Sequence, residues 1–157
     1  MDLLFIVLSI FLVILNGFFV ATEFAFVKLR PTRIDELLKQ HPTRAYFVPH
    51  IITHLDSYLS AIQLGITLAS IALGWIGEPA FARLLEPVLV SIGLSDPNIL
   101  HPVAFTSAFF VITFLHIIVG ELAPKSVAIA RPEEVTLALA LPMRVFYVAF
   151  YLFVWLL

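Results

Sequence analysis

The chain has 157 residues, of which 61% are apolar and 13% are charged, and its formal net charge is −2. A typical soluble domain contains about 25% charged and about 45–50% apolar residues. This composition therefore excludes an ordinary soluble enzyme and indicates a protein that lies in lipid. The chain contains no cysteine, which excludes disulfides and thiolate metal sites. Its weak overall charge also argues against a nucleic-acid partner.

The first predicted element is a membrane-spanning helix over residues 3–27. This apolar run is longer than the roughly 20 residues that cross the hydrocarbon core of a bilayer as a helix. Asp2 precedes the run, whereas Lys28, Arg30 and Arg33 follow it. Basic residues collect on the cytoplasmic side of a membrane, so we expect an uncleaved span with its N-terminus outside.

Residues 28–57 are expected to form short juxtamembrane helices in the cytoplasm. The segment holds more than half of the nine basic residues of the chain. Thr32 and Asp35 predict the start of a helix, and Pro42 and Pro49 break the segment that follows.

Two further spans are predicted over residues 59–76 and 102–123. The segment between them, residues 78–100, contains three acidic residues, one arginine and three prolines, so we expect an external loop of short helices. Lys125 and Arg131 follow the third span and return the chain to the cytoplasm.

The tail, residues 132–157, is long enough to span the membrane or to lie along it. Pro142 and Arg144 lie in its first half, and aromatic residues crowd its second half. An arginine near the bilayer midplane costs about 2.5 kcal/mol or more, whereas arginine and aromatic residues suit the interface. We therefore expect a bent, belt-like helix at the cytoplasmic face, and an all-α integral membrane fold with three transmembrane helices. The apolar end of the chain suggests a piece of a longer protein.

The second span carries a polar stripe whose members recur every three or four residues: Ser60, Gln63, Thr67, Ser70 and Gly74. The stripe either lines a cavity or forms hydrogen bonds between helices. Small residues on the opposite face of this span allow close helix packing. The candidates for a dimer contact on that face are Ala61, Gly65 and Ala69.

A break is predicted near the end of the third span. Pro124 has no N–H, so the carbonyl of Gly120 lacks its helical partner, and Glu121 lies beside it. A freed carbonyl next to a carboxylate suits a hard cation such as Mg²⁺ or Na⁺. The alternative is a hydrated kink in which Lys125 neutralises Glu121. His116 is more simply interpreted as a packing or hydrogen-bonding residue.

In the first span, Asn16 and Glu23 lie seven residues apart and therefore share one face of the helix. Polar residues inside membrane spans are costly and often mark ion pathways. Glu23 is either an ion ligand or the partner of Lys28 or Arg30 at the interface.

Three stretches of the sequence together resemble the transmembrane domain of the cyclin M/CorC family, including its haemolysin-like bacterial branch. They are residues 16–25, residues 59–79, and the Gly-Glu-x-x-Pro-Lys motif within residues 120–126. The resemblance implies a homodimer in the bacterial cell membrane that exports Mg²⁺ in exchange for Na⁺. In longer members, cytoplasmic CBS domains bind nucleotide, and usually a CorC-type domain follows; neither is present in this chain.

Carried onto this sequence, the resemblance implies an ion pocket formed by Thr22, Glu23, Gln63, Gly120 and Glu121. Members tied to magnesium tend to have serine at the position of Val20 and asparagines near that of Ile62. Valine and isoleucine cannot ligate an ion, so this chain departs from the family pattern at two positions.

Two functions follow from these observations. The first is transport of a divalent cation, most simply Mg²⁺ efflux, in which Pro124 holds the helix break and Lys125 balances charge. The expected metal ligands are Thr22, Glu23, Gln63, Ser70, Gly120 and Glu121. The second is a dimeric membrane anchor that transports nothing and presents regulatory CBS domains. The sequence shows no nucleophile paired with a base, so it gives no indication of an enzyme.

Overall fold

The protein is described by a computed structural model over residues 2–156, and this range is helical without strands, which confirms the all-α prediction. The elements in chain order are α1 (Asp2–Lys28), η1 (Pro31–Arg33), α2 (Ile34–Gln40), α3 (Val48–Thr53), α4 (Leu55–Ser91), α5 (Pro97–Leu115), η2 (His116–Leu122), α6 (Ala123–Ala130), α7 (Pro132–Ala149) and α8 (Tyr151–Leu156).

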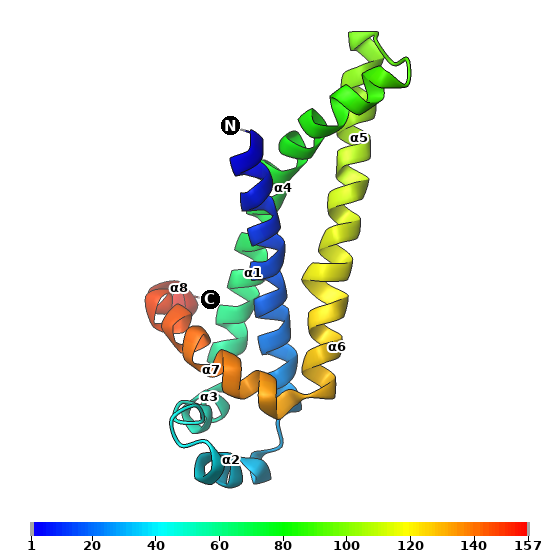
Figure 1. Cartoon of the computed structure of the whole chain (residues 1–157). Helices are drawn as coiled ribbons and strands as arrows, with labels where there is room; N and C mark the ends of the chain where they lie inside the picture. Colours follow the sequence, from blue (N-terminus) through cyan, green and yellow to red (C-terminus); the bar gives the residue numbers. More distant parts are fainter. Residues whose placement is uncertain (1, 157) are drawn as a thin grey trace.

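Within the described residues, three helical stretches are long and apolar enough to cross a membrane. They cover Leu3–Lys28, Leu55–Ser91 and Pro97–Ala130, which confirms a three-span membrane domain. Figure 1 shows α1 between α4 and the α5–α6 rod, with α7 lying across one end of this bundle. We call that end the belt end, and we call the opposite end, at the α4–α5 turn, the hairpin end.

The second span is much longer than predicted. Helix α4 continues through Pro79 and Pro87 to Ser91, so most of the expected external loop is instead a helical hairpin with α5. Proline keeps a helical φ and removes only one backbone hydrogen bond, and packing against α5 outweighs that loss. The 37 residues of α4 extend roughly 55 Å, well beyond a hydrocarbon core of about 30 Å. The turn itself contains Gly93 at a φ of 99°, which favours glycine.

The closest packing in the bundle is between α1 and α4. A Cβ at Gly65 would lie 2.4 Å from the ring of Phe19, so this crossing requires glycine. Ala61 and Ala69 are also buried within the chain. These three small residues, which we expected on a dimer contact, are instead covered inside the protomer.

We predict that Gly65→Ala destabilises the protein by about 1–3 kcal/mol, because the added methyl group overpacks a site filled by Phe19. The matched control is Gly74→Ala on the same helix, where a Cβ meets nothing within 4 Å. Thermal unfolding in detergent should show a melting temperature several degrees lower for Gly65→Ala alone. Equal melting temperatures would show that the α1–α4 crossing is looser than described.

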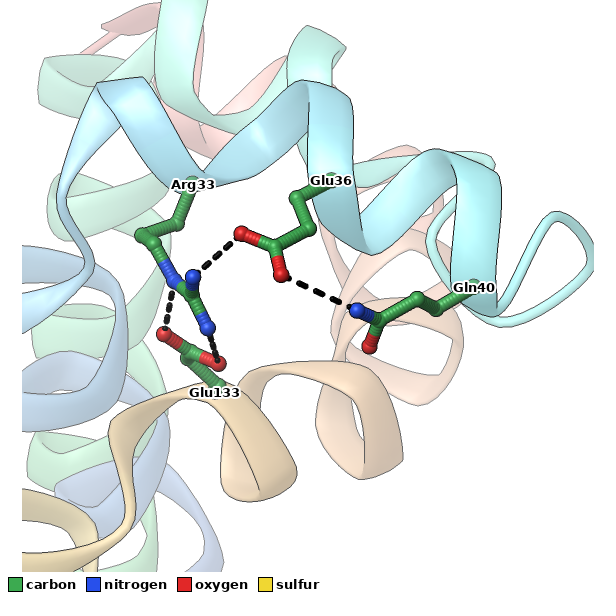
Figure 2. A network of polar contacts seen from close by, with 4 residues as sticks. All are labelled: Arg33, Glu36, Gln40 and Glu133. Carbon is green, nitrogen blue, oxygen red and sulfur yellow. Dashed lines mark hydrogen bonds and ion pairs between the residues drawn. The ribbon is translucent and has the colours of Figure 1, made fainter.

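Helix α7 is attached to the belt end by an ion pair. Figure 2 shows Arg33 beside Glu133, with Glu36 and Gln40 completing the network. Arg33 donates from Nε to Glu133 Oε1 at 2.7 Å and from Nη2 to Oε2 at 3.2 Å. These hydrogen bonds hold the pKa of Glu133 below its ordinary value. The first residue of α7 is Pro132, so the pair fixes where the belt helix begins.

A second contact joins α7 to α3 and α4. Arg144 donates from Nη1 to His50 Nε2 and to the hydroxyl of Tyr58, both at 2.9 Å. Burial lowers the pKa of His50, and the nearby Arg144 and His54 lower it further, so the imidazole stays neutral and accepts. The basic residue that argued against a fourth span is therefore used to dock the belt.

The start of α2 differs from prediction. Residues Pro31–Arg33 form a 3₁₀ turn, and α2 begins at Ile34 with no side-chain cap. Thr32 is exposed and does not cap the helix. The helix follows directly from the preceding turn, because Arg33 already has helical backbone angles.

We predict that Glu133→Gln loosens the start of α7, because a neutral amide cannot replace a carboxylate that accepts with both of its oxygens from one edge of the guanidinium. Amide hydrogen exchange around Glu133 should rise, whereas Glu134→Gln, which removes only a 3.5 Å contact with Arg131, should leave it unchanged. Since the pKa of Glu133 is lowered, the pair is fully formed above the ordinary value of 4.5 and is lost as the pH falls through the folded-state pKa. Loosening between pH 7 and pH 5 would contradict this assignment.

Candidate functional site

Asn16 joins all three spans at the centre of the bundle. Its side chain is only 2% exposed. From α1, Nδ2 donates to the carbonyl of Gly120 at 2.9 Å and lies 3.4 Å from Nε2 of His116, both in η2. Its Oδ1 accepts from the hydroxyl of Ser70 on α4 at 3.4 Å. We call this group of four residues the Asn16 junction.

The third span changes from an α-helix to a π-helix at the Asn16 junction. Residues His116–Leu122 form a π-helix between α5 and α6. Pro124 has no N–H to donate to the carbonyl of Gly120, and the Asn16 amide donates to it instead. The carbonyl that the sequence singled out thus accepts a hydrogen bond from a side chain of α1.

A glycine on α1 makes this contact possible. A Cβ at Gly17 would lie 2.9 Å from Pro124 Cγ and 3.2 Å from the carbonyl of Val119, so a larger residue would push α1 away from this part of the third span. A Cβ at Gly120 would make only ordinary contact, 3.4 Å from Asn16 Nδ2 and from the carbonyl of Val13. The approach of α1 to the π-helix thus depends on the small residue at position 17.

A second polar contact lies towards the belt end of the bundle. Gln63 on α4 donates from Nε2 to Oε1 of Glu23 on α1 at 2.9 Å. Glu23 is half-buried and Gln63 is exposed. Neither basic residue considered as the partner of Glu23, Lys28 or Arg30, makes an ion pair with it in the described structure.

The structure brings some of the expected ligands together and separates others. Glu23 meets Gln63, and Ser70 meets the Gly120 region through Asn16. The hydroxyl of Thr22 is buried and donates to the carbonyl of Phe18 on its own helix.

Glu121 is exposed and makes no hydrogen bond or ion pair within the described residues. Its outward direction follows from the π-helix, whose wider turn changes the face that each side chain occupies relative to an α-helix. Lys125 does not neutralise it, because its Nζ lies 4.5 Å from the ring centre of Phe24 on α1, a cation–π contact.

No group of three or more histidine or acidic side chains capable of holding a metal is found in residues 2–156. Apart from the single imidazole of His116, the polar groups of the expected ligands and the Asn16 junction are two carboxylates, amides, hydroxyls and a backbone carbonyl. Such oxygen atoms suit Mg²⁺ or Na⁺.

Asn16 is the functional residue that sequence reasoning placed on the correct face and left out of the ligand set. The sequence did offer an indication, because an unpaired amide inside an apolar span is costly in free energy and therefore requires a hydrogen-bond partner. The identity of that partner depends on how α1 and η2 cross, which no local pattern contains. The interpretation of His116 as a hydrogen-bonding residue agrees with its position 3.4 Å from Asn16.

The fold and these contacts define a class: an all-α, three-span membrane domain whose spans are joined by buried polar groups. Comparison of the sequence with family models gives the family directly. The chain belongs to the cyclin M family, because the model described as "Cyclin M transmembrane N-terminal domain" matches residues 7–157.

Individual relatives agree with this assignment. The chain is 53% identical over 146 residues to UPF0053 protein YhdT of Bacillus subtilis, which covers 93% of this chain and 32% of that relative. It is 46% identical over 157 residues to UPF0053 protein YhdP of the same organism, covering 100% of this chain and 35% of the relative. It is 36% identical over 154 residues to the uncharacterized protein Rv1841c of Mycobacterium tuberculosis, covering 93% and 43%. The chain thus spans about a third of the length of the two Bacillus relatives.

We predict that Asn16→Leu destabilises the bundle, because a side chain of similar shape leaves the Gly120 carbonyl and the Ser70 hydroxyl without their partner. Each interhelical hydrogen bond in a membrane protein contributes about 0.6 to 1.7 kcal/mol. Unfolding in detergent should therefore show a loss of roughly 1–3 kcal/mol.

A double-mutant cycle with Ser70→Ala supplies the control for this prediction. The effects of Asn16→Leu and Ser70→Ala should not add, because both remove the same contact. Ser60→Ala should add independently, since that hydroxyl bonds only the carbonyl of Asp56 on its own helix. Full additivity of the Asn16 and Ser70 effects would contradict the junction.

Proposed function

We propose that this chain is the membrane domain of a transporter that exports Mg²⁺ in exchange for Na⁺, without ATP hydrolysis. The observation that carries the proposal is the Gly120 carbonyl, which Pro124 releases from its helix and Asn16 holds at 2.9 Å. Freed carbonyls at broken membrane helices are common ligands of transported ions. Membership of the cyclin M family supports this choice of function.

The Asn16 amide can exchange its contacts by rotating about its terminal bond. In the structure, Nδ2 faces the Gly120 carbonyl and Oδ1 faces Ser70. After a half-turn, Oδ1 faces Gly120, and two oxygens converge on a cation between them. The hydroxyl of Ser70 suits both arrangements, because it donates to Oδ1 in one and accepts from Nδ2 in the other.

Glu23 and Gln63 supply the charge that the neutral oxygens lack. Glu23 lies seven residues after Asn16 on α1, a rise of about 10 Å along the same face. A cation that leaves Asn16 towards the belt end next meets the Glu23 carboxylate and the Gln63 amide oxygen. Thr22 and Glu121 remain proposed ligands: the Thr22 oxygen can still accept, and Glu121 must turn inward to reach the site.

The orientation that we propose places the N-terminus outside and the belt end in the cytoplasm of a bacterial cell. Basic residues gather at the belt end, where Lys28, Arg30, Arg33 and Arg131 flank the spans. In this orientation Glu23 lies near the cytoplasmic source of exported Mg²⁺, and Asn16 lies deeper in the membrane. The proposal includes a homodimer, as the family resemblance implies.

One observation favours a second candidate function, a dimeric anchor that presents regulatory CBS domains. Val20 and Ile62 stand where magnesium-linked members tend to have oxygen-bearing side chains, and both are buried, at 5% and 0% exposure. Apolar residues there give no ligand. An anchor would keep the bundle and the polar junction as structural contacts and would bind no cation.

We predict saturable binding of Mg²⁺ to the detergent-purified protein, and its loss in Glu23→Gln, because the amide removes the negative charge but keeps the shape. Isothermal titration with Mg²⁺, Mn²⁺ and Ca²⁺ measures this directly. Glu134→Gln is the matched control, since it removes an exposed carboxylate outside the spans.

Glu121→Gln tests which of the two carboxylates, Glu23 or Glu121, binds the ion. If it alone abolishes binding while Glu23→Gln binds normally, the ion lies at the helix break and the Glu23–Gln63 assignment is wrong. Absence of binding for every cation would favour the anchor. If binding is present, Mg²⁺ flux from proteoliposomes should depend on an opposing Na⁺ gradient, and flux that ignores Na⁺ would contradict the exchange.

A further inference from the structure

A cleft of about 270 Å³ lies between α4 and α5 on the side of the Asn16 junction that faces the hairpin end. Its lining is largely apolar, but polar side chains come from both walls: Ser70 and Glu78 on α4, with Gly74 between them, and Thr113 and His116 at the α5–η2 boundary. The three α4 positions are four residues apart and therefore form one row along the helix.

The cleft and the Asn16 junction share two residues. Ser70 and His116 line the cleft and also contact the side chain of Asn16. Glu78 lies eight residues from Ser70, a rise of about 12 Å along α4 towards the hairpin end. The polar row therefore starts near that end of the bundle and leads directly to Asn16.

Glu78 is a half-buried carboxylate within an apolar candidate span, and it makes no hydrogen bond or ion pair with any described residue. Carboxylates inside membrane spans are costly to bury and usually face water-filled cavities. Gly74 also lines the cleft, and a Cβ there would meet nothing within 4 Å. Space, a carboxylate and several polar side chains thus occur together in one otherwise apolar cleft.

We infer that the α4–α5 cleft is a hydrated passage for the cation between the Asn16 junction and the hairpin-end side of the membrane, with Glu78 as the first carboxylate on that side. This inference rests on the proposed transport function and orientation, in which the hairpin end faces outside. It assigns to Glu78 the attraction of cations, and to Ser70 and His116 the link with Asn16. Glu23 and Gln63 serve the opposite side.

The lack of cysteine in the chain allows a direct test, because each introduced cysteine is the only thiol. Gly74→Cys and Thr113→Cys place a thiol in the cleft, whereas Ile71→Cys and Phe114→Cys place one on exposed apolar positions of the same helices. Spheroplasts expressing each full chain are treated with a membrane-impermeant cationic methanethiosulfonate. A thiol reacts as its thiolate, so only a hydrated position is labelled quickly.

Both cleft cysteines should be labelled from outside roughly tenfold faster than the apolar controls. Adding Glu78→Gln should slow the cationic reagent several-fold and leave a neutral reagent of similar size unchanged, because only the cation is attracted by the carboxylate. Cleft cysteines that react no faster than the controls, or that react only from the cytoplasmic side, would overturn the inference. Equal rates with and without the Glu78 carboxylate would overturn the role of that residue.

The labelling result stays separable from the proposed function. Thiol reactivity reports access of water and does not require transport, so it can be positive in a protein that binds no Mg²⁺. In that case the hydrated cleft is supported and its use by Mg²⁺ is wrong. Conversely, Mg²⁺ binding that depends on Glu23 with unlabelled cleft cysteines keeps the proposed function and removes this passage.

Discussion

A single buried amide determines how the three spans meet. Asn16 uses both ends of its side chain, donating to η2 and accepting from α4, and it lies where lipid offers no other partner. The contact requires a glycine at position 17, where a Cβ would clash with Pro124, and Pro124 has no N–H to offer the Gly120 carbonyl. The approach of α1 to the π-helix depends on this residue, and the position of α4 depends on it together with the packing of Gly65 on Phe19.

Much of this fold could be predicted from sequence, because the features concerned are local. The existence of three spans follows from hydropathy. The missing N–H of Pro124 indicates an irregularity near Gly120, which the structure shows as a π-helix rather than a break. The extent of α4 could not be predicted. Pro79 and Pro87 indicate interruption by local rules, yet they are tolerated here because the helix packs along α5.

The candidate site was predicted less completely, because its contacts join residues far apart in the chain. Glu23 and Gln63 were both expected ligands, but only the crossing of α1 and α4 shows that they bond each other. Gly65 illustrates the converse. A face of small residues predicts close packing without saying whether the partner is the same chain or a second copy, and here it is Phe19. Glu121 points outward because the π-helix departs from the spacing assumed for an α-helix.

The most direct test of this account follows the Asn16 amide while Mg²⁺ is added. The chain has only two asparagines, Asn16 and Asn98, so ¹⁵N-asparagine labelling gives two side-chain amide signals. Asn98 bonds Asp96 in the hairpin turn and serves as an internal reference. Exchange of the Gly120 carbonyl for a new partner predicts that Mg²⁺ shifts the Asn16 signal saturably and leaves the Asn98 signal in place. An Asn16 signal that stays unchanged at Mg²⁺ concentrations that saturate binding would contradict the account.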